Sequence, residues 1–280
     1  MSKALTPLAV NTAMFDGHDL AHAFAIIAET GYRYLELAYN EGYVGNLNPM
    51  LFSTASAHRV KELMLESGLS TVALGCTMNL AGADTVEKFR LRIRFAHMLG
   101  VRCLNACTTQ LPEREQMIKN LREIAPEAED SDCVICLENG GDPNYDAFTT
   151  AEDGIRLLEE IGHPAVALNI DPGNMLSLAP ELDPVEQTLM MLPYAEHFHI
   201  KDVEMRNGEF WFPAIGDGVI NYGAILPALT ERGIPCSLEI PLRMHRQSDC
   251  WPIRSEEPAP LEDSRAVLTR SLAGIQRLLK

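Results

Sequence analysis

Short β-rich runs alternate with amphipathic helical stretches along the whole chain, and this alternation limits the possible folds more than any other feature. The predicted strands are residues 8–14, 33–39, 70–78, 101–108, 133–139, 165–173, 197–202 and 236–241. The predicted helices are 19–30, 53–67, 83–99, 112–128, 149–161, 183–193, 221–232 and 262–279. Strands that alternate with helices form a parallel sheet, and eight such units are the number that closes a (β/α)8 barrel.

A doubly wound open sheet is the alternative fold for such a sequence. It is disfavoured because no GxGxxG motif follows any strand and because polar residues gather at the ends of many strands, not at one crevice. We therefore predict an α/β protein with a single TIM-barrel domain over residues 1–280, with insertions at about 203–217 and about 242–261. Both insertions follow late strands, on the face where barrel enzymes carry their active sites.

Charge and hydropathy limit the partners of the protein. The chain carries 39 acidic and 23 basic residues, a formal charge of −16, with no cluster of Lys and Arg beyond short pairs. Such a chain repels phosphate backbones and anionic membranes. No window approaches the roughly 20 apolar residues that span a bilayer, and the N-terminus lacks the apolar region of a signal peptide. We expect a cytoplasmic protein that binds neither nucleic acid nor membrane.

The cysteine pair Cys133 and Cys136 has the CxxC spacing of many metal and redox sites. It lies in a predicted strand, however, where side chains three residues apart point to opposite faces. The two thiols are therefore expected to share neither a metal nor a disulfide. We predict that most of the seven cysteines are buried, reduced side chains.

Four residues of metal-ligand type lie near the carboxyl ends of four consecutive predicted strands: Glu138, Asp171, His199 and Glu239. Counting back by twos along each strand gives positions that share their inward face, such as Cys136, Asn169, His197 and Ser237. The skipped positions are aliphatic and suit the helix-facing side: Leu137, Ile170, Ile200 and Leu238. The sequence therefore predicts that the four polar side chains converge inside the barrel.

Three converging carboxylates would repel one another and raise their pKa values unless a cation neutralised them. Two Glu, one Asp and one His form an oxygen-rich site that suits one divalent metal ion, Mn, Mg, Co or Zn. Each residue alone has a simpler structural explanation, since an Asp before Pro-Gly often shapes a turn and an inward His often belongs to the core. The joint pattern is much harder to obtain by accident.

The segments that carry these residues read LEN (137–139), DPGN (171–174), HIKD (199–202) and SLEIP (237–241). In this order the chain resembles the sugar isomerase/epimerase superfamily with the xylose-isomerase-like TIM barrel, which includes ketose 3-epimerases, hydroxypyruvate isomerase and inosose dehydratase. The resemblance implies one divalent metal bound by Glu138, Asp171, His199 and Glu239. It also implies that Glu138 and Glu239 act as acid/base catalysts, and that the protein assembles as a homodimer or homotetramer.

The expected activity is therefore that of a metal-dependent isomerase or epimerase. Its substrate would be a small keto sugar or a sugar-acid or sugar-phosphate derivative, with proton transfer through a metal-bound enediolate. The alternative is a metal-dependent lyase, a decarboxylase or dehydratase of a keto-sugar acid or keto-polyol, since the same enolate arises by decarboxylation or can expel hydroxide. Asn174 stands where ketose 3-epimerases carry a substrate-binding His, which argues against epimerisation of free ketohexoses.

Further side chains are candidates for binding the carbohydrate substrate: Asn174, Lys201, His197, Arg243, Glu36 and Asn11. Core or supporting roles are the alternative for His197, and a solvated rim position is the alternative for Glu36 and Asn11. Arg243 is the preferred anion ligand, because its fork matches a carboxylate or phosphate. For Arg206 and Arg246 a surface role is favoured.

Two other functions fit the sequence less well. An abasic-site endonuclease with the same barrel would need a basic DNA-binding face and several more histidines for a multi-zinc cluster, and the acidic charge argues against it. A non-catalytic sugar-binding barrel is the remaining alternative. Turnover left intact after substitution of Glu138 or Glu239 by Ala would overturn the proposed acid/base mechanism.

Overall fold

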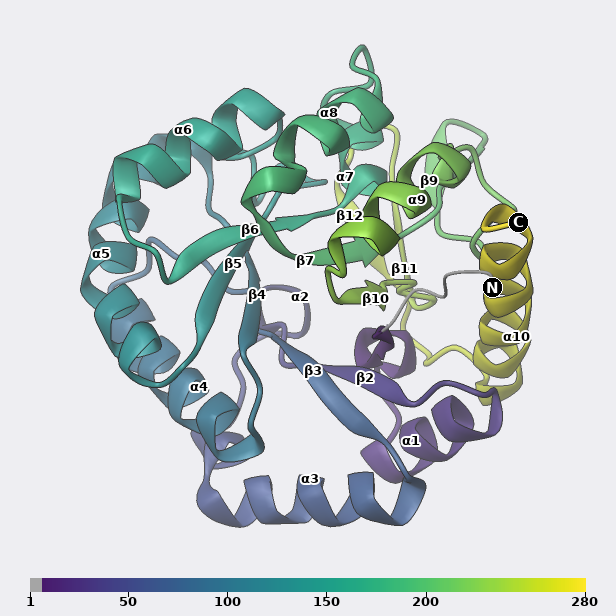
Figure 1. Ribbon diagram of the computed structural model, residues 1–280, viewed down its shortest axis with the longest axis horizontal. Helices are drawn as coiled ribbons and strands as arrows, with labels where there is room; N and C mark the ends of the chain where they lie inside the picture. The colour runs from purple at the N-terminus through teal and green to yellow at the C-terminus, as the bar shows by residue number, and fades with distance from the viewer. Residues whose placement is uncertain (1–6) are drawn as a thin grey trace.

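The computed structural model describes residues 7–280, and they form a closed barrel of eight parallel strands (Figure 1). The strands are β1 (Leu8–Asn11), β2 (Tyr34–Ala38), β3 (Ser70–Gly75), β4 (Cys103–Cys107), β5 (Val134–Glu138), β6 (Val166–Ile170), β7 (Ala195–Ile200) and β10 (Cys236–Leu238). Neighbouring strands pair in chain order, and β10 closes the barrel on β1. The predicted (β/α)8 fold is confirmed, and the doubly wound alternative is wrong.

Helices surround the barrel on all sides (Figure 1). They are α1 (Leu20–Glu29), α3 (Thr54–Ser67), α4 (Thr85–Leu99), α5 (Arg114–Asp130), α6 (Ala151–Ile161), α8 (Pro184–Met191), α9 (Tyr222–Arg232) and α10 (Leu261–Leu278). Each buries one apolar face, as α5 does with Met117, Leu121, Ile124 and Ala128 at helical spacing. Within residues 7–280, no helix is both long and apolar enough to cross a membrane.

The two faces of the barrel strands differ as the alternation predicts. Small side chains fill part of the barrel interior as a separate cluster: Ala73, Cys103, Val134, Cys136 and Ala167. The aliphatic residues that alternate with the inward-facing ones pack in the main core with the helices: Leu137, Ile170, Ile200 and Leu238. Cys133 belongs to that main core while Cys136 faces the interior, so the CxxC thiols are separated by the sheet and both are free.

The strand predicted over residues 165–173 is too long. β6 ends at Ile170, and a helix the sequence analysis did not predict, α7 (Pro172–Leu178), begins directly after Asp171. Proline is favoured in the first helical turn because its missing N–H has no partner there. Asp171 Oδ1 accepts hydrogen bonds from the backbone nitrogens of Gly173 and Asn174, at 2.8 and 3.2 Å. The N-cap role therefore fixes the orientation of this carboxylate at the strand end.

The segments after β7 and β10 contain a second, antiparallel sheet. It consists of β8 (Glu204–Arg206), β9 (Glu209–Trp211), β11 (Met244–Arg246) and β12 (Pro252–Arg254), with β11 next to β9. A tight turn joins β8 to β9, with Asn207 and Gly208 at φ values of 53° and 83° that a two-residue hairpin of this kind requires. The two insertions therefore form one structure beside the barrel mouth.

Candidate metal centre

The four predicted metal ligands meet at the carboxyl end of the barrel. Glu138 is the last residue of β5, Asp171 follows β6, His199 lies in β7 and Glu239 follows β10. Each offers one ligand atom, and these atoms lie within 4.8 Å of one another. His199 Nδ1 is 3.3 Å from Glu138 Oε1 and 3.5 Å from Glu239 Oε1. The barrel thus brings together four side chains that are far apart in the sequence.

The donor set fits a divalent metal ion. Three carboxylates and one imidazole converge, and all but Glu239 are almost completely buried. Asp171 Oδ2 receives no hydrogen bond from any residue that the structure describes, although Lys201 Nζ lies 2.6 Å away. The single ammonium of Lys201 cannot balance three converging carboxylates, and a divalent cation would supply the remaining positive charge. Asp171, Glu138, Glu239 and His199 are therefore the residues that would hold the metal.

Lys201 supplies positive charge to this cluster. Its Nζ lies 2.6 Å from both Asp171 Oδ2 and Glu239 Oε2, and its side chain is 2% exposed. Burial alone would lower the pKa of Lys201, but the two carboxylates raise it above its ordinary value. Burial also raises the pKa of Asp171 to about 7, against the effect of Lys201. For Glu239 the attraction of Lys201 and His199 outweighs burial and holds its pKa well below the usual range.

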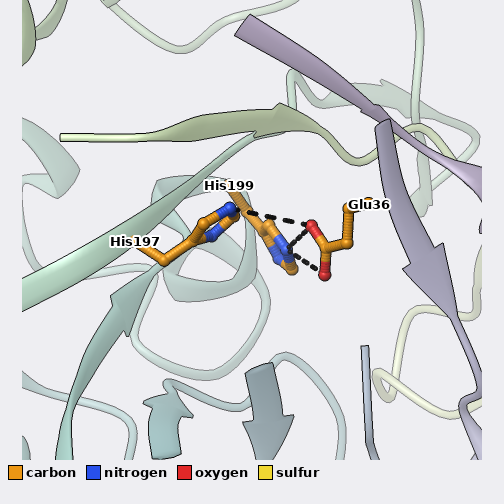
Figure 2. A group of neighbouring side chains, drawn as sticks. All are labelled: Glu36, His197 and His199. Carbon is orange, nitrogen blue, oxygen red and sulfur yellow. Dashed lines mark hydrogen bonds and ion pairs between the residues drawn. The ribbon is translucent and has the colours of Figure 1, made fainter. Parts of the chain in front are cut away.

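Glu36 contacts the imidazole of His199, as Figure 2 shows. The contact is to Nε2, whereas Nδ1 faces Glu138 and Glu239. His199 Nε2 lies 3.0 Å from Glu36 Oε2, and Asn105 Nδ2 donates to Glu36 Oε1 at 2.9 Å. Burial alone would raise the pKa of Glu36, but His199 above all lowers it to about 2. A carboxylate that accepts the Nε2 proton leaves Nδ1 free to bind a metal and fixes the ring plane.

His197 lies one layer deeper than His199 and is fully buried. A second set of possible metal ligands lies close together here: Glu36, His197 and His199. The ring nitrogens of His197 already have protein partners: Nδ1 contacts Asn169 Oδ1 at 3.1 Å and Nε2 contacts the Ser237 hydroxyl at 3.1 Å. His199 Nε2 also has a protein partner, Glu36, so we interpret this group as support for the centre formed by Glu138, Asp171, His199 and Glu239.

Glu36→Gln is expected to weaken divalent metal binding by about 10- to 100-fold, because the amide no longer orients His199 or favours the Nδ1 ligand form. Mn titration by isothermal calorimetry measures this. Glu62→Gln, at a surface position, is the control and should bind Mn like the unmodified protein. Unchanged Mn affinity in Glu36→Gln would contradict the supporting role.

His197 gives a pH-dependent contribution to stability. Burial lowers its pKa from 6.5 to about 4. Between these values the unfolded chain binds a proton that the folded metal-free protein does not, so the free energy of unfolding should fall as the pH drops through this range. Urea denaturation at several pH values should show a shallower fall for His197→Gln. An identical slope in both proteins would contradict this assignment.

A pocket opens above the metal centre and contains several of the predicted substrate ligands. Glu138, Asn174, Lys201, Glu239 and Arg243 all line it. Asn174 Nδ2 donates to Glu138 Oε1 at 2.9 Å, so this side chain also orients a proposed catalytic carboxylate.

Three predicted substrate ligands do not reach this pocket. Glu36, His197 and Asn11 are each at most 1% exposed, and none of them lines it. Glu36 and His197 lie beneath the centre, while Asn11 Oδ1 accepts from Ala13 N at the start of the 3-10 helix η1 (Thr12–Phe15). Direct substrate contact by these three therefore stays a prediction, and their burial does not favour it. Strand alternation correctly predicts that these side chains face inward, but it does not predict how deep in the barrel they lie.

The structure adds pocket residues that the sequence analysis missed. Tyr43, Phe212, His18 and His245 line the pocket, and the ring of His245 stacks on Trp211 with centroids 4.2 Å apart. His18 and Tyr43 lie in the segments that follow β1 and β2, and position after a barrel strand is the one signal that would have indicated them. Nothing in the local sequence separates these side chains from ordinary loop residues.

Fold and site together define a TIM barrel with a carboxylate and histidine centre, suited to a divalent metal, at its carboxyl-terminal mouth. The chain belongs to the family described as xylose isomerase-like TIM barrel, which matches residues 24–270. This confirms the resemblance inferred from the four strand-end segments. No curated protein gives a significant sequence match.

Solved structures of enzymes share the fold at low sequence identity. D-Psicose 3-epimerase from Clostridium cellulolyticum H10, solved with D-tagatose, superposes with a TM-score of 0.75 at 16% identity, covering 98% of this chain and 99% of that one. D-Allulose 3-epimerase from Methylomonas sp., solved with D-allulose, gives 0.72 at 19%, covering 96% of both chains. The probable 3-DHS dehydratase of Bacillus anthracis, involved in petrobactin synthesis, gives 0.70 at 17%, covering 98% of both.

Proposed function

We propose that the protein is a divalent-metal-dependent isomerase or epimerase of a small keto sugar or a sugar derivative. The observation that carries this proposal is the position of Glu138 and Glu239, whose Oε1 atoms lie 3.3 and 3.5 Å from the same His199 nitrogen. Two carboxylates at one centre allow one to remove a proton and the other to return it. The epimerase structures with the same fold support this class of reaction.

The surroundings of the two glutamates suit them for proton transfer. Lys201 Nζ donates to Glu239 Oε2 at 2.6 Å and keeps this carboxylate ionised, which is the state that a base needs. Glu138 accepts hydrogen bonds from Asn174 at 2.9 Å and from Asn169 at 3.3 Å, which fix its position. When bound, the divalent cation supplies the positive charge that stabilises the enediolate of a substrate after it loses a proton next to its carbonyl.

A metal-dependent lyase, a dehydratase or decarboxylase of a keto-sugar acid or keto-polyol, is the second candidate. Two observations favour it: arginines line the pocket beside the metal centre, and a probable dehydratase has the same fold. In a dehydration, one glutamate would remove the proton next to the carbonyl and the other would protonate the hydroxyl that leaves as water. In a decarboxylation, CO2 leaves and a glutamate would return a proton to the carbon that carried it.

Incubation of the Mn-loaded protein with keto sugars and keto-sugar acids in deuterated water separates the two candidates. Incorporation of deuterium at carbon with no loss of carbon or oxygen supports the isomerase. Release of CO2 or water from the substrate supports the lyase. Neither result in a broad panel would overturn the proposed function.

A further inference from the structure

Arg246 is a buried cation that lacks an acidic partner. Residues 7–280 contain four Arg or Lys residues that are at most 9% exposed: Arg92, Lys201, Arg243 and Arg246. Arg92 pairs with Glu41 at 2.8 Å, Lys201 pairs with Asp171 and Glu239, and Arg243 lies 3.5 Å from Asp16. Arg246 is 6% exposed and forms no ion pair with any carboxylate in this part of the chain.

Neutral groups surround the Arg246 guanidinium. Nη2 donates to Asn174 Oδ1 at 2.7 Å and Nη1 donates to Ser177 Oγ at 3.0 Å, while the Phe212 ring lies 5.3 Å from the guanidinium carbon. Gly141 also lies close to the guanidinium, since an added Cβ there would come within 2.4 Å of Nη1. The guanidinium is therefore held in place, yet these contacts leave its charge uncompensated.

Arg246 lies beside the proposed reacting groups. It lines the same pocket as Glu138 and Glu239. The amide of Asn174 joins the two parts of the site, since its Oδ1 accepts from Arg246 and its Nδ2 donates to Glu138 at 2.9 Å. A ligand group bound by Arg246 would thus lie close to Glu138, the proposed acid/base carboxylate, because Asn174 contacts both residues.

A buried charge without a counter-charge is unfavourable, and a guanidinium offers five donors, of which side-chain contacts here use two. We propose that the substrate carries a carboxylate and that Arg246 binds it, so the enzyme acts on a keto-sugar acid in preference to the neutral ketose. This inference rests on the proposed function for the location of the substrate. Arg246, and not Arg243 as the sequence suggested, is then the residue that binds the anionic group.

The neighbouring cations favour a carboxylate over a phosphate. Arg243 is already held by Asp16 and by the carbonyl oxygens of Ser255 and Glu256. Lys201 is held by the two metal-centre carboxylates. One free guanidinium matches the charge and the two oxygens of a carboxylate, whereas a phosphate dianion calls for further donors.

The test compares ligands that differ at one group. D-Fructuronate differs from D-fructose, and hydroxypyruvate from dihydroxyacetone, in having a carboxylate in place of a hydroxymethyl group. Binding to the Mn-loaded protein is measured by isothermal calorimetry. We expect each acid to bind more tightly than its neutral counterpart, and Arg246→Gln to weaken acid binding by about 10- to 100-fold and neutral binding much less.

Two variants control for folding and for general charge. Arg246→Lys keeps the positive charge and should retain part of the preference for acids. Arg206→Gln removes an exposed arginine of the same antiparallel sheet, which pairs with Glu204, and should behave like the unmodified protein. Circular dichroism and thermal unfolding verify that each variant is folded.

The inference is overturned if the acid-to-neutral ratio is the same in the unmodified protein and in Arg246→Gln, or if no acid binds. Tighter binding of dihydroxyacetone phosphate than of hydroxypyruvate would also overturn it. Deuterium exchange is measured in parallel and separates this outcome from failure of the proposed function. Exchange without an acid preference removes only the inference, and Arg246-dependent acid binding without any exchange or elimination removes only the proposed reaction.

Discussion

Glu239→Gln is expected to reduce metal-dependent proton exchange by at least about 10³-fold. General acid–base catalysis alone contributes about 10²- to 10⁴-fold, and this carboxylate is also one of the four proposed metal ligands. Its Oε1 faces His199 Nδ1 at 3.5 Å and its Oε2 faces Lys201 Nζ at 2.6 Å, so an amide would alter both contacts. Glu239 is also the most exposed of the four ligands, at 14% of its side chain, and it lines the pocket where substrate would bind.

The measurement has to separate lost catalysis from lost metal. Bound Mn is determined by elemental analysis of the protein at saturating metal, and deuterium exchange is measured on the same samples. Glu204→Gln, on the nearby antiparallel sheet, is the matched control, because its only ion pair is with the exposed Arg206 in the part of the chain that the structure describes. Full exchange by a Glu239→Gln protein would contradict the proposed mechanism.

The convergence of the four candidate metal ligands could be predicted from sequence because the barrel imposes a simple rule. Strand periodicity determines which side chains face inward, and the parallel arrangement brings all carboxyl ends to one mouth. Glu138 and His199 could therefore be placed together although the strands that carry them are far apart in the chain. Asp171 was placed correctly even though its strand was predicted too long, because a residue just past a strand still lies at the same mouth.

The burial of Arg246 beside the pocket could not be predicted by the same rule. Its burial depends on β11 pairing with β9, where Arg246 lies opposite Phe210. Nothing local in either short strand specifies this partner, so the side chain looks like surface charge in the sequence. Glu36 shows a related limit: alternation turns it inward, but its depth relative to His199 depends on the three-dimensional stagger of strands on different sides of the barrel.

Lys201→Met is expected to destabilise the metal-free protein by about 3–5 kcal/mol at pH 8, because removing one partner of a buried ion pair leaves uncompensated charge. Lys201 is 2% exposed and contacts both Asp171 and Glu239 at 2.6 Å. Met has similar length and no charge, so packing changes little. Saturating Mn should recover much of the loss, since the cation supplies the charge that the ammonium gave.

The pH dependence of this loss has a definite sign. Without Lys201, the buried carboxylates of Asp171 and Glu239 lose an attraction that lowers their pKa values, so both pKa values rise. A carboxyl whose folded pKa exceeds its unfolded value destabilises the fold at high pH and ceases to do so once the pH falls below both values. The difference between Lys201→Met and the unmodified metal-free protein should therefore shrink between pH 8 and pH 5.5.

Urea denaturation of the metal-free proteins at both pH values, and again with Mn, measures these differences. Lys119→Met, on the exposed side of α5, controls for the loss of a lysine and should remain within about 0.5 kcal/mol of the unmodified protein. Equal stability of Lys201→Met and the unmodified metal-free protein would mean that the cost of burying the ammonium offsets its attraction to the carboxylates. In that case Lys201 would be retained for the chemistry of the site, where its ammonium lines the pocket, and not for the stability of the metal-free fold.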